Sequence, residues 1–430
     1  MNTRRSLLLA AALAAAPSLA PAQEYHAIWG SGPNDVWIAG GGQALHYDGR
    51  AWTMTSLGNV TVRAIWGSAP GDVWAVGDGG AILHWNGRAW SRSQAPPPVR
   101  ADLIAVNGCS ATEAYVIGQS DDEGRPPALL RWNGQLWTAD SLTVTVRVAG
   151  LAGGCGNLVV VGYGYFDPRP DQRRLAGVVA RRRANAWTLT GWDGRRITDS
   201  LIGNVAWTRV SARGATTLLF GQRADGESVM LLSAAAGWRR VPPPQLGPGM
   251  TMPDDPLAFL TGDGSVIMLL GELGFARYAA GRWTVTNPQA AMQQQIQQAM
   301  QGAPQLQPGR QPTQQEIIEM ARRAQQAQEA MGDLTTLASR MVALNFRSAT
   351  AAWAPATGAG DLYVLSTNGL VSRISGTSGT VELDPTCLQP QLAAVAEQCR
   401  ANPIVQGTGA APAAAPGRRT LPTPTRRNKP

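Results

Sequence analysis

Short segments of alternating apolar and polar residues recur along this chain, with glycine, asparagine or aspartate between them. The segment Ala27–Trp37, AIWGSGPNDVW, returns 37 positions later as Ala64–Trp74, AIWGSAPGDVW, without a gap. A glycine-rich turn, an alternating segment ending in Leu-His-aromatic, and an Asp-Gly or Asn-Gly pair then lead to a tryptophan. β-Branched and aromatic residues between turn formers are typical of strands. The pattern predicts four short strands per copy, with Asp48-Gly49 or Asn86-Gly87 closing a tight hairpin of the primed type.

Later copies diverge but keep this frame, and they cover about Asp102–Asp140, Val146–Thr190, Val205–Val241, Pro256–Asn287 and Thr350–Leu383. A period in this range marks a repeat architecture. One four-stranded sheet per copy predicts an all-β protein, a seven-bladed β-propeller, with six or eight blades left open. The tryptophans that close the first six copies are expected to fill the space between blades; they are Trp52, Trp90, Trp137, Trp187, Trp238 and Trp283.

Glutamine replaces the strand pattern from residue 288 to residue 341. Thr313 with Glu316 forms a capping box, and apolar residues then recur every three or four positions from Ile317 to Met341. Two helices, the second long and amphipathic, are therefore expected as an α-helical insertion between blades six and seven. They can be a brace across the propeller or an arm that docks a partner, and the frequency of ordinary methionine packing favours the brace.

The two ends of the chain differ from the repeats. Arg4 and Arg5 precede a short apolar run and the small-residue site Ala20-Pro21-Ala22, a pattern that indicates a secretory signal peptide cleaved near Ala22. The run is about half of what a spanning helix needs, so the mature protein is expected in the periplasm or secreted, and not membrane-spanning. The export route, Sec or twin-arginine, stays open. The predicted domains are signal peptide 1–22, blades one to six 23–287, insertion 288–341, last blade 342–384, a short disulfide-closed helix 385–400, and a disordered basic tail 401–430 rich in proline and alanine.

The formal net charge of +8 does not indicate a nucleic-acid partner. Two arginines leave with the signal and five basic residues stand in the last thirty positions, which leaves +1 for the rest of the chain. A nearly neutral body lacks the electrostatic footprint of nucleic-acid binding.

Four cysteines in an exported chain favour disulfides. Three pairings are possible, and we predict the local one, in which Cys109 bonds to Cys155 and Cys387 bonds to Cys399. The cysteines lack CxxC spacing, and the three histidines supply no ligand cluster, so no metal and no cofactor is expected.

Basic or titratable side chains occupy one equivalent position in five copies: His46, His84, Arg131, Arg277 and Arg373. This position is expected to face solvent on a strand, or to form a ring that binds an anion. The repeated acids Asp35, Asp72 and Asp361 are expected to cap turns, because Asp side chains hydrogen-bond nearby backbone.

Three aromatic residues are further candidates for ligand contact. Trp192 and Trp207 lie outside the positions that the repeat fixes, so they are candidate platforms for a sugar. Tyr165 belongs to a long, aromatic and charged loop of the fourth copy, and loops of this kind carry function on rigid scaffolds. No catalytic residue is assigned.

The unit WGSxPxDVWAVG, followed by HWNGxxW, resembles the secreted propeller repeats of the Asp-box (sialidase-type) and photosystem-assembly-factor-like groups, and more distantly the kelch and WD repeats. The resemblance covers roughly Tyr25–Asp384 and is strongest in the first two copies. It implies a propeller, and it implies either a carbohydrate-active enzyme, hydrolase or lyase, or a factor that assembles a membrane complex.

The sequence shows no nucleophile–base pair and no phosphate loop beside its strongly specified repeat. We therefore expect an exported, non-enzymatic scaffold, a monomer, that binds a protein or carbohydrate partner in the cell envelope. The enzyme and the assembly factor remain alternatives, because fold alone does not choose between them.

Overall fold

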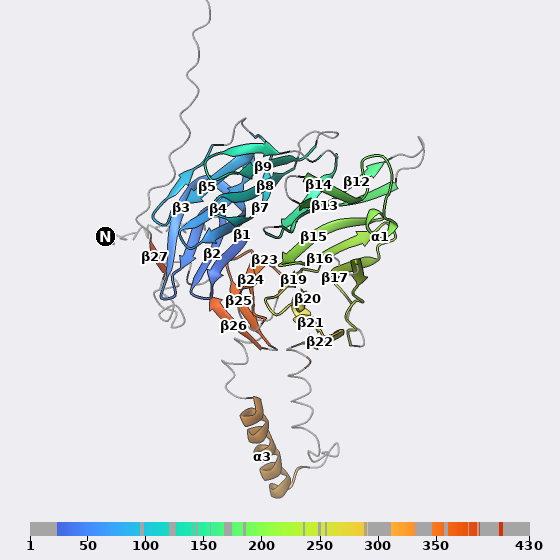
Figure 1. Ribbon diagram of the computed structural model, residues 1–430. Helices are drawn as coiled ribbons and strands as arrows, with labels where there is room; N and C mark the ends of the chain where they lie inside the picture. The colour runs from blue at the N-terminus through green and yellow to red at the C-terminus, as the bar shows by residue number, and fades with distance from the viewer. Residues whose placement is uncertain are drawn as a thin grey trace, which may run out of the picture.

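The computed structural model is all-β apart from short helical segments (Figure 1). It describes residues 24–94, 99–119, 126–140, 142, 145–154, 156–166, 174–183, 186–234, 237–247, 251–253, 256–287, 290, 311–331, 346–356, 360–376, 378–384, 387 and 404–406. The predicted signal peptide 1–22 lies outside these residues.

The strands form six sheets, numbered here in chain order. Sheet 1 contains β1 (Tyr25–Gly32), β2 (Asp35–Tyr47), β3 (Trp52–Ala69), β4 (Asp72–Gly77), β5 (Ala81–Trp85) and β6 (Trp90–Arg92). Sheet 2 contains β7 (Leu103–Ser110), β8 (Glu113–Gly118), β9 (Ala128–Trp132) and β10 (Trp137–Asp140), and sheet 3 contains β11 (Arg147–Ala152), β12 (Leu158–Phe166), β13 (Arg174–Arg183) and β14 (Ala186–Gly191).

The other three sheets also have four antiparallel strands each. Sheet 4 contains β15 (Val205–Arg213), β16 (Thr216–Arg223), β17 (Ser228–Ala234) and β18 (Gly237–Arg240). Sheet 5 contains β19 (Ala258–Leu260), β20 (Val266–Leu269), β21 (Phe275–Ala279) and β22 (Arg282–Thr286), and sheet 6 contains β23 (Ala349–Trp353), β24 (Leu362–Ser366), β25 (Val371–Ser375) and β26 (Ser378–Leu383).

The expected seven separate blades are corrected to six, because the first two copies share one sheet. Their junction is β3, an unbroken strand of 18 residues. Its beginning pairs with β2, where Trp52 lies opposite Tyr47, and its end pairs with β4, where Trp66 lies opposite Trp74. No proline or charged residue interrupts the connecting residues 57–61, LGNVT, and the strand continues through Gly58, whose φ of +73° is one that glycine adopts without strain.

The sheets follow one another around a ring. The first strands of most neighbouring copies contact each other, and β23 of sheet 6 contacts β1 of sheet 1, so the last copy lies next to the first (Figure 1). The backbone N–H of Tyr25 donates to the carbonyl of Thr367 across this junction, at 2.9 Å, and the Thr350 hydroxyl donates to the carbonyl of Tyr25, at 3.1 Å. The strands on the two sides of this junction belong to different sheets, so it is closed largely by side-chain packing.

The core consists of apolar layers between successive sheets and copies. Trp52, Trp90 and Trp137 are each at least 96% buried, which confirms for these three the prediction that closing tryptophans fill the space between copies. The other three, Trp187, Trp238 and Trp283, are only partly buried and pack against core layers. The Trp-Gly pair of the repeat adds a second contact. The Trp29 ring covers Gly67 of the next copy so closely that a Cβ added there would lie 2.6 Å from Cη2 of the indole.

Most first strands carry the same irregularity. The register with the second strand shifts one residue after the start, as between Tyr25 and Ala27 or between Val62 and Ala64. A shift at the same place occurs in β7, β11, β15 and β23. β-Bulges bend and twist a strand, and the irregularity recurs near the start of every described first strand except β19.

The hairpin between third and fourth strands differs from its prediction. Tyr47 pairs with Trp52, so the loop has four residues, 48–51, and only Gly49 has a positive φ, +87°. A primed two-residue turn needs two paired residues directly around Asp48-Gly49, so that prediction was wrong. The Asp48 carboxylate accepts from the backbone N–H groups of Arg50 and Ala51, both at 2.9 Å.

Outside the sheets, the described helices are α1 (Ser200–Gly203), α3 (Gln314–Met331) and two 3₁₀ turns, Asp78–Gly80 and Gly271–Leu273. The capping box at α3 is confirmed: the Thr313 N–H donates to Glu316 at 2.8 Å, and the Glu316 N–H donates to Thr313 Oγ1 at 3.3 Å. The first expected helix lies outside the described residues. Figure 1 draws α3 apart from the sheets, an arrangement that does not favour the brace.

The C-terminal segment contains one unexpected strand. Residues 401–430 were predicted to be disordered, yet β27 (Ile404–Gln406) pairs in parallel with β3, so the prediction was wrong for these three residues. Among the described residues no cysteine is free. The predicted partners Cys155 and Cys399 lie outside the described residues, so the pairing stays a prediction. No described helix has both the length and the apolar character to cross a membrane.

Candidate functional site

One polar cluster recurs at the same place in most copies, at the edge where the second strand begins and the third ends. An acid starts the second strand, an aromatic ring follows two residues later on the same face, and a basic residue lies opposite on the third strand. The cross-strand pairs Trp74–His84, Tyr115–Arg131 and Tyr363–Arg373 show this register. Period-two alternation of strand side chains brings the acid, the ring and the base together. We call this arrangement the acid–ring–base cluster.

In the first copy the cluster consists of Asp35, Trp37 and His46. His46 Nε2 lies 2.6 Å from Asp35 Oδ1, and its ring stacks on Trp37 with centroids 4.0 Å apart and planes 7° apart. The Ser31 N–H also donates to Asp35, at 3.3 Å. The imidazole is thus held on two sides, by a carboxylate at its edge and an indole at its face.

The second copy repeats this geometry. His84 Nε2 lies 2.6 Å from Asp72 Oδ1 and stacks on Trp74 with centroids 4.1 Å apart. The Ser68 hydroxyl donates to the other oxygen of Asp72. Serine and histidine both bind the carboxylate here, so the three do not form the nucleophile–base–acid relay of a hydrolase.

Arginine and tyrosine replace histidine and tryptophan in the third copy. The Tyr115 hydroxyl donates to Glu113 at 2.6 Å, and Arg131 lies 3.7 Å from the same carboxylate oxygen. Burial, then the hydrogen bond to Glu113, raises the pKa of Tyr115 to about 12. The phenol therefore stays a hydrogen-bond donor at neutral pH.

In the last copy the base makes two hydrogen bonds to its acid. Arg373 donates to Asp361 Oδ2 from Nη2 at 2.6 Å and from Nε at 3.1 Å, and its guanidinium lies 5.7 Å from the centre of the Tyr363 ring. The hydrogen bond to Asp361 raises the pKa of Arg373, and burial raises the pKa of Tyr363 to about 12.

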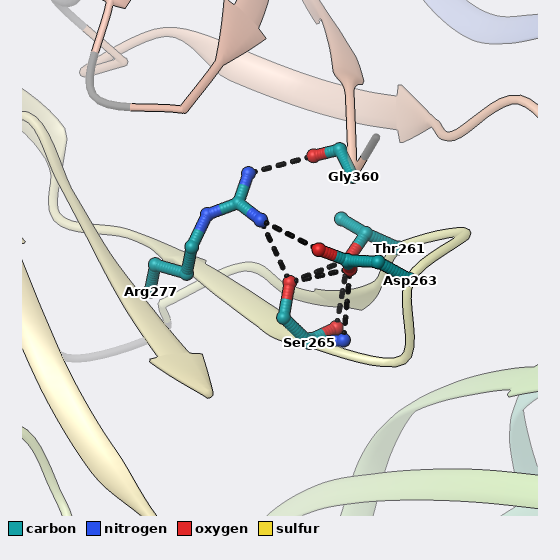
Figure 2. Close-up of polar contacts among 5 residues, drawn as sticks. All are labelled: Thr261, Asp263, Ser265, Arg277 and Gly360. Carbon is teal, nitrogen blue, oxygen red and sulfur yellow. Dashed lines mark hydrogen bonds and ion pairs between the residues drawn. The ribbon is translucent and has the colours of Figure 1, made fainter. Parts of the chain in front are cut away.

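Sheet 5 has a variant of the cluster without an aromatic ring (Figure 2). Arg277 Nη1 donates to Ser265 Oγ at 2.9 Å and to Asp263 Oδ2 at 3.2 Å, and Nη2 donates to the carbonyl of Gly360 in the next sheet at 2.7 Å. Asp263 Oδ1 accepts from the hydroxyls of Thr261 and Ser265 at 2.6 and 2.8 Å. Arg277 thereby links sheets 5 and 6.

The fourth copy uses an amide in place of the acid. Arg181 Nη1 donates to Asn157 Oδ1 at 3.0 Å, and its guanidinium lies 4.8 Å from the centre of the Trp238 ring in sheet 4. The neighbouring Arg182, 93% buried, pairs with Asp140 of sheet 2.

The acids of the two histidine clusters are held in the ionised form. Burial alone would raise the pKa of Asp35, but hydrogen bonds from His46 and Ser31 outweigh it and lower the pKa. For Asp72, hydrogen bonds from His84 and Ser68 likewise outweigh burial and lower the pKa. The pKa of Asp263 is also lowered, because its hydroxyl and backbone donors outweigh burial. Each carboxylate therefore pairs with a basic residue of its own sheet or accepts hydrogen bonds from its own turn.

The sequence-predicted site residues fall into two groups. The five basic residues do share one position, but each contacts an acid of its own sheet. Three of these acids, Asp35, Asp72 and Asp361, were predicted from the sequence only to cap turns. The recurring interval of eleven or twelve residues between Asp35 and His46, Asp72 and His84, and Asp361 and Arg373 was the available signal. Whether the ring of bases also binds an anion stays a hypothesis.

The three aromatic candidates differ in how far their side chains are buried. Trp207 is fully buried and donates from Nε1 to the carbonyl of Ile202 at 3.0 Å, and Trp192 is 8% exposed within a core layer, so neither offers an open face to a sugar. Tyr165, near the end of β12, is 54% exposed. Only Tyr165 of the three has the accessibility that ligand contact requires.

A small hollow lies at the junction of the last and first copies. It is lined by Pro33, Val36, Tyr47, Trp52, Tyr363, Val371 and Glu382. Three aromatic rings and one carboxylate therefore meet beside the two clusters that flank this junction. Within the described residues, no group of three or more potential metal ligands is present.

Comparison with known proteins adds to this description of the fold. No protein-family model matches the chain, and no curated protein matches it. Solved structures do match: YCF48 bound to a D1 peptide is 13% identical, with a TM-score of 0.43 over 61% of this chain and 82% of that chain.

Two propellers of other kinds match over similar lengths of this chain. A fungal lectin from Aleuria aurantia, a six-bladed β-propeller that recognises fucose, is 16% identical, with a TM-score of 0.38 over 61% of this chain and 94% of that chain. An ancestral GH74 enzyme is 13% identical, with a TM-score of 0.40 over 61% of this chain and 40% of that chain. At such identities the likeness concerns the fold alone, and the chain is similar to β-propellers of several functions.

Proposed function

We propose that this chain is an exported, non-enzymatic β-propeller scaffold that binds a protein or carbohydrate partner in the cell envelope. The observation that carries the proposal is the internal pairing of the repeat's charges. In four copies the acid of the cluster contacts the base of the same cluster, as Asp35 does with His46 and Asp361 with Arg373.

This pairing argues against the carbohydrate-active alternative. A glycosidase needs two carboxyl groups across one bond, one of them kept protonated by its surroundings near neutral pH. The pKa values of Asp35, Asp72 and Asp263 are shifted the opposite way, because their donors favour the carboxylate. The repeated acids therefore fit a structural role. The turns, which differ from sheet to sheet, are then the parts of the propeller that can contact a partner.

Tyr165 supports a contact surface at the outer turns of sheet 3. Its ring is 54% exposed, and it stands at the end of β12 opposite Leu175. Tyrosine combines a large apolar face with a polar tip, and this combination suits contact with protein or sugar.

The test combines capture and turnover. The tagged mature chain is used to capture components from an envelope extract of its native cell and from a glycan array, in parallel with Tyr165→Ala and with Leu136→Ala. Leu136 is 45% exposed on sheet 2 and serves as a matched control. We expect saturable capture by the parent chain and by Leu136→Ala, and a loss of about ten-fold or more for Tyr165→Ala if this ring anchors the partner.

Turnover is measured on a panel of glycosides with the same preparations. The scaffold proposal expects none. Turnover that is lost in Asp72→Asn, in a chain that remains folded, would establish the carbohydrate-active enzyme instead.

A further inference from the structure

The outer edges of the sheets are not equivalent. The outermost strands β6, β10, β18, β22 and β26 each contain at least one charged residue: Arg92, Asp140, Arg239, Arg240, Arg282 and Glu382. Charged side chains on an edge strand discourage pairing with another strand. β14, which has no charge, is contacted by α1.

The outer edge of the first copy is the exception. The beginning of β3, Trp52–Ser56, has the sequence WTMTS and contains no charged residue. Its inner edge pairs with β2, where His46 lies opposite Thr53. An uncharged strand with one unpaired row of backbone groups is a template for another strand.

This edge does receive a strand in the structure. β27 pairs in parallel with β3, with Ile404 opposite Trp52, Val405 opposite Thr53 and Gln406 opposite Met54 (Figure 1). The segment is uncharged and contains two β-branched residues, which favour extended backbone. The edge and the segment therefore match in charge and in strand propensity.

The pairing has the properties of an exchangeable contact. It covers three residues, and parallel ladders are slightly less stable per residue than antiparallel ones. Twenty residues separate the end of β26, Leu383, from Ile404, so β27 is tethered to the ring. Tethering raises the local concentration of such a segment at its edge, and a competing segment must overcome this advantage.

We propose that the outer edge of β3 at Trp52–Met54 is a strand-binding site for an extended, uncharged peptide segment of a protein partner, with β27 as its intramolecular occupant. The proposal rests on the proposed function as a binding scaffold and narrows its partner to a protein. Main-chain hydrogen bonds would supply the affinity, and displacement of β27 would make binding depend on the state of the C-terminal segment.

The test uses the full chain and a labelled peptide of residues 401–410, ANPIVQGTGA, as the probe. Val405→Pro removes the central N–H of β27, and proline is excluded from paired positions of a ladder. Ala410→Pro makes the same kind of change outside the strand and is the matched control. We expect Val405→Pro to bind the peptide about ten-fold or more tightly than the parent chain or Ala410→Pro, because the competing segment is released.

Further measurements keep the outcome interpretable. Ile404→Pro is a second release variant, and the amide hydrogen exchange of Trp52–Met54 reports directly whether β27 has left its edge. A peptide with proline in place of Val405 is expected not to bind. Equal affinity in all chains, or no binding to either release variant whose edge amides have lost protection, would overturn the proposal.

The same variants and peptide also distinguish two other outcomes, self-association of the chain and a partner that binds elsewhere on the propeller. A concentration-dependent dimer of the parent chain that disappears in Val405→Pro would assign the edge to a second copy and overturn the proposal. Capture of an envelope partner that is unaffected by saturating peptide or by the release variants would remove the strand site and leave the scaffold function standing. Glycoside turnover would remove the scaffold function without deciding the strand site.

Discussion

The indole of Trp353, in the last copy, covers Gly30, in the first strand of the first copy. A Cβ added at Gly30 would lie 2.9 Å from Cη2 of Trp353 and 2.4 Å from the carbonyl oxygen of Asp35. Trp29 covers Gly67 in the same way, and Trp66 covers Gly108. The contact that joins neighbouring copies along the chain therefore also joins its last copy to its first.

This relationship predicts that Gly30→Ala destabilises the fold. The added methyl group meets backbone on one side, which cannot move without disturbing the ladder between β1 and β2. We expect a loss of about 1–3 kcal/mol in the free energy of unfolding, as for other overpacked sites. Urea unfolding followed by tryptophan fluorescence measures it.

Gly32→Ala is the matched control, two residues further along the same strand. A Cβ at Gly32 meets no atom within 4 Å, so we expect a change within about 0.5 kcal/mol. Equal losses at the two positions would show that the covering ring and the Asp35 carbonyl do not determine the effect.

The acid of the second cluster predicts a pH dependence. Folding lowers the pKa of Asp72 below its ordinary value of 3.8, so the ionised acid stabilises the folded chain. This stabilisation is complete above the ordinary pKa and is lost as the pH falls through the lower pKa of the folded state. We expect Asp72→Asn to cost about 1–3 kcal/mol at neutral pH, the usual worth of a hydrogen bond to a charged group.

The difference between Asp72→Asn and the parent chain should shrink as the pH is lowered through and below 3.8. Unfolding curves at a series of pH values measure this trend. Asp225→Asn is the control, because Asp225 is 62% exposed and an amide can keep its bond from the Glu227 N–H. A difference for Asp72→Asn that stays constant down to acid pH would contradict the linkage.

Parts of this architecture could be predicted from the sequence because the signal is local. The pairing of Asp48 with the following backbone N–H groups, the strands around each Asp-Gly or Asn-Gly, and the Thr313–Glu316 cap all depend on neighbours within a few residues. The repeat also predicts the ring of sheets, because each copy presents the same apolar faces to the next.

Other parts depend on distances that a single copy does not reveal. No feature of residues 57–61 indicates that β3 continues from the first copy into the second. The seven copies therefore predicted seven sheets, whereas the structure has six. Asp35 and Asp72 look like turn caps in sequence, and only the register between second and third strands shows that each contacts a histidine. β27 is three residues in a segment of tail-like composition, and its partner strand lies about 350 positions away.

The ion pair of the last copy can be tested by a double-mutant cycle. Asp361 is 9% exposed, and its Oδ2 lies 2.6 Å from Nη2 of Arg373. Arg373→Met leaves a buried carboxylate without its cation, and we expect a loss of about 2–4 kcal/mol, at the lower part of the range for buried pairs because Arg373 is partly exposed. Asp361→Asn together with Arg373→Met should restore part of this loss.

Arg240→Met provides the comparison for that cycle. Arg240 pairs with Glu227, and both side chains are about half exposed, so solvent screens the interaction and we expect little change. Thermal unfolding of the parent chain, Asp361→Asn, Arg373→Met and the double variant gives the coupling energy between Asp361 and Arg373. A coupling near zero for Asp361 and Arg373 would mean that the pair contributes no more than an exposed one.

The predicted disulfides Cys109–Cys155 and Cys387–Cys399 are tested on the chain isolated from its native compartment. Non-reducing peptide mapping is expected to recover these two linked pairs. Cys387→Ser with Cys399→Ser should cost about 2–4 kcal/mol, because the crosslink closes a short loop and restricts the unfolded chain. The same double substitution should also loosen the tether that leads to β27, so hydrogen exchange at Trp52–Met54 should rise with it. Recovery of a linked peptide that joins Cys109 or Cys155 to Cys387 or Cys399 would contradict the local pairing and would place the C-terminal segment against the third or fourth copy of the repeat.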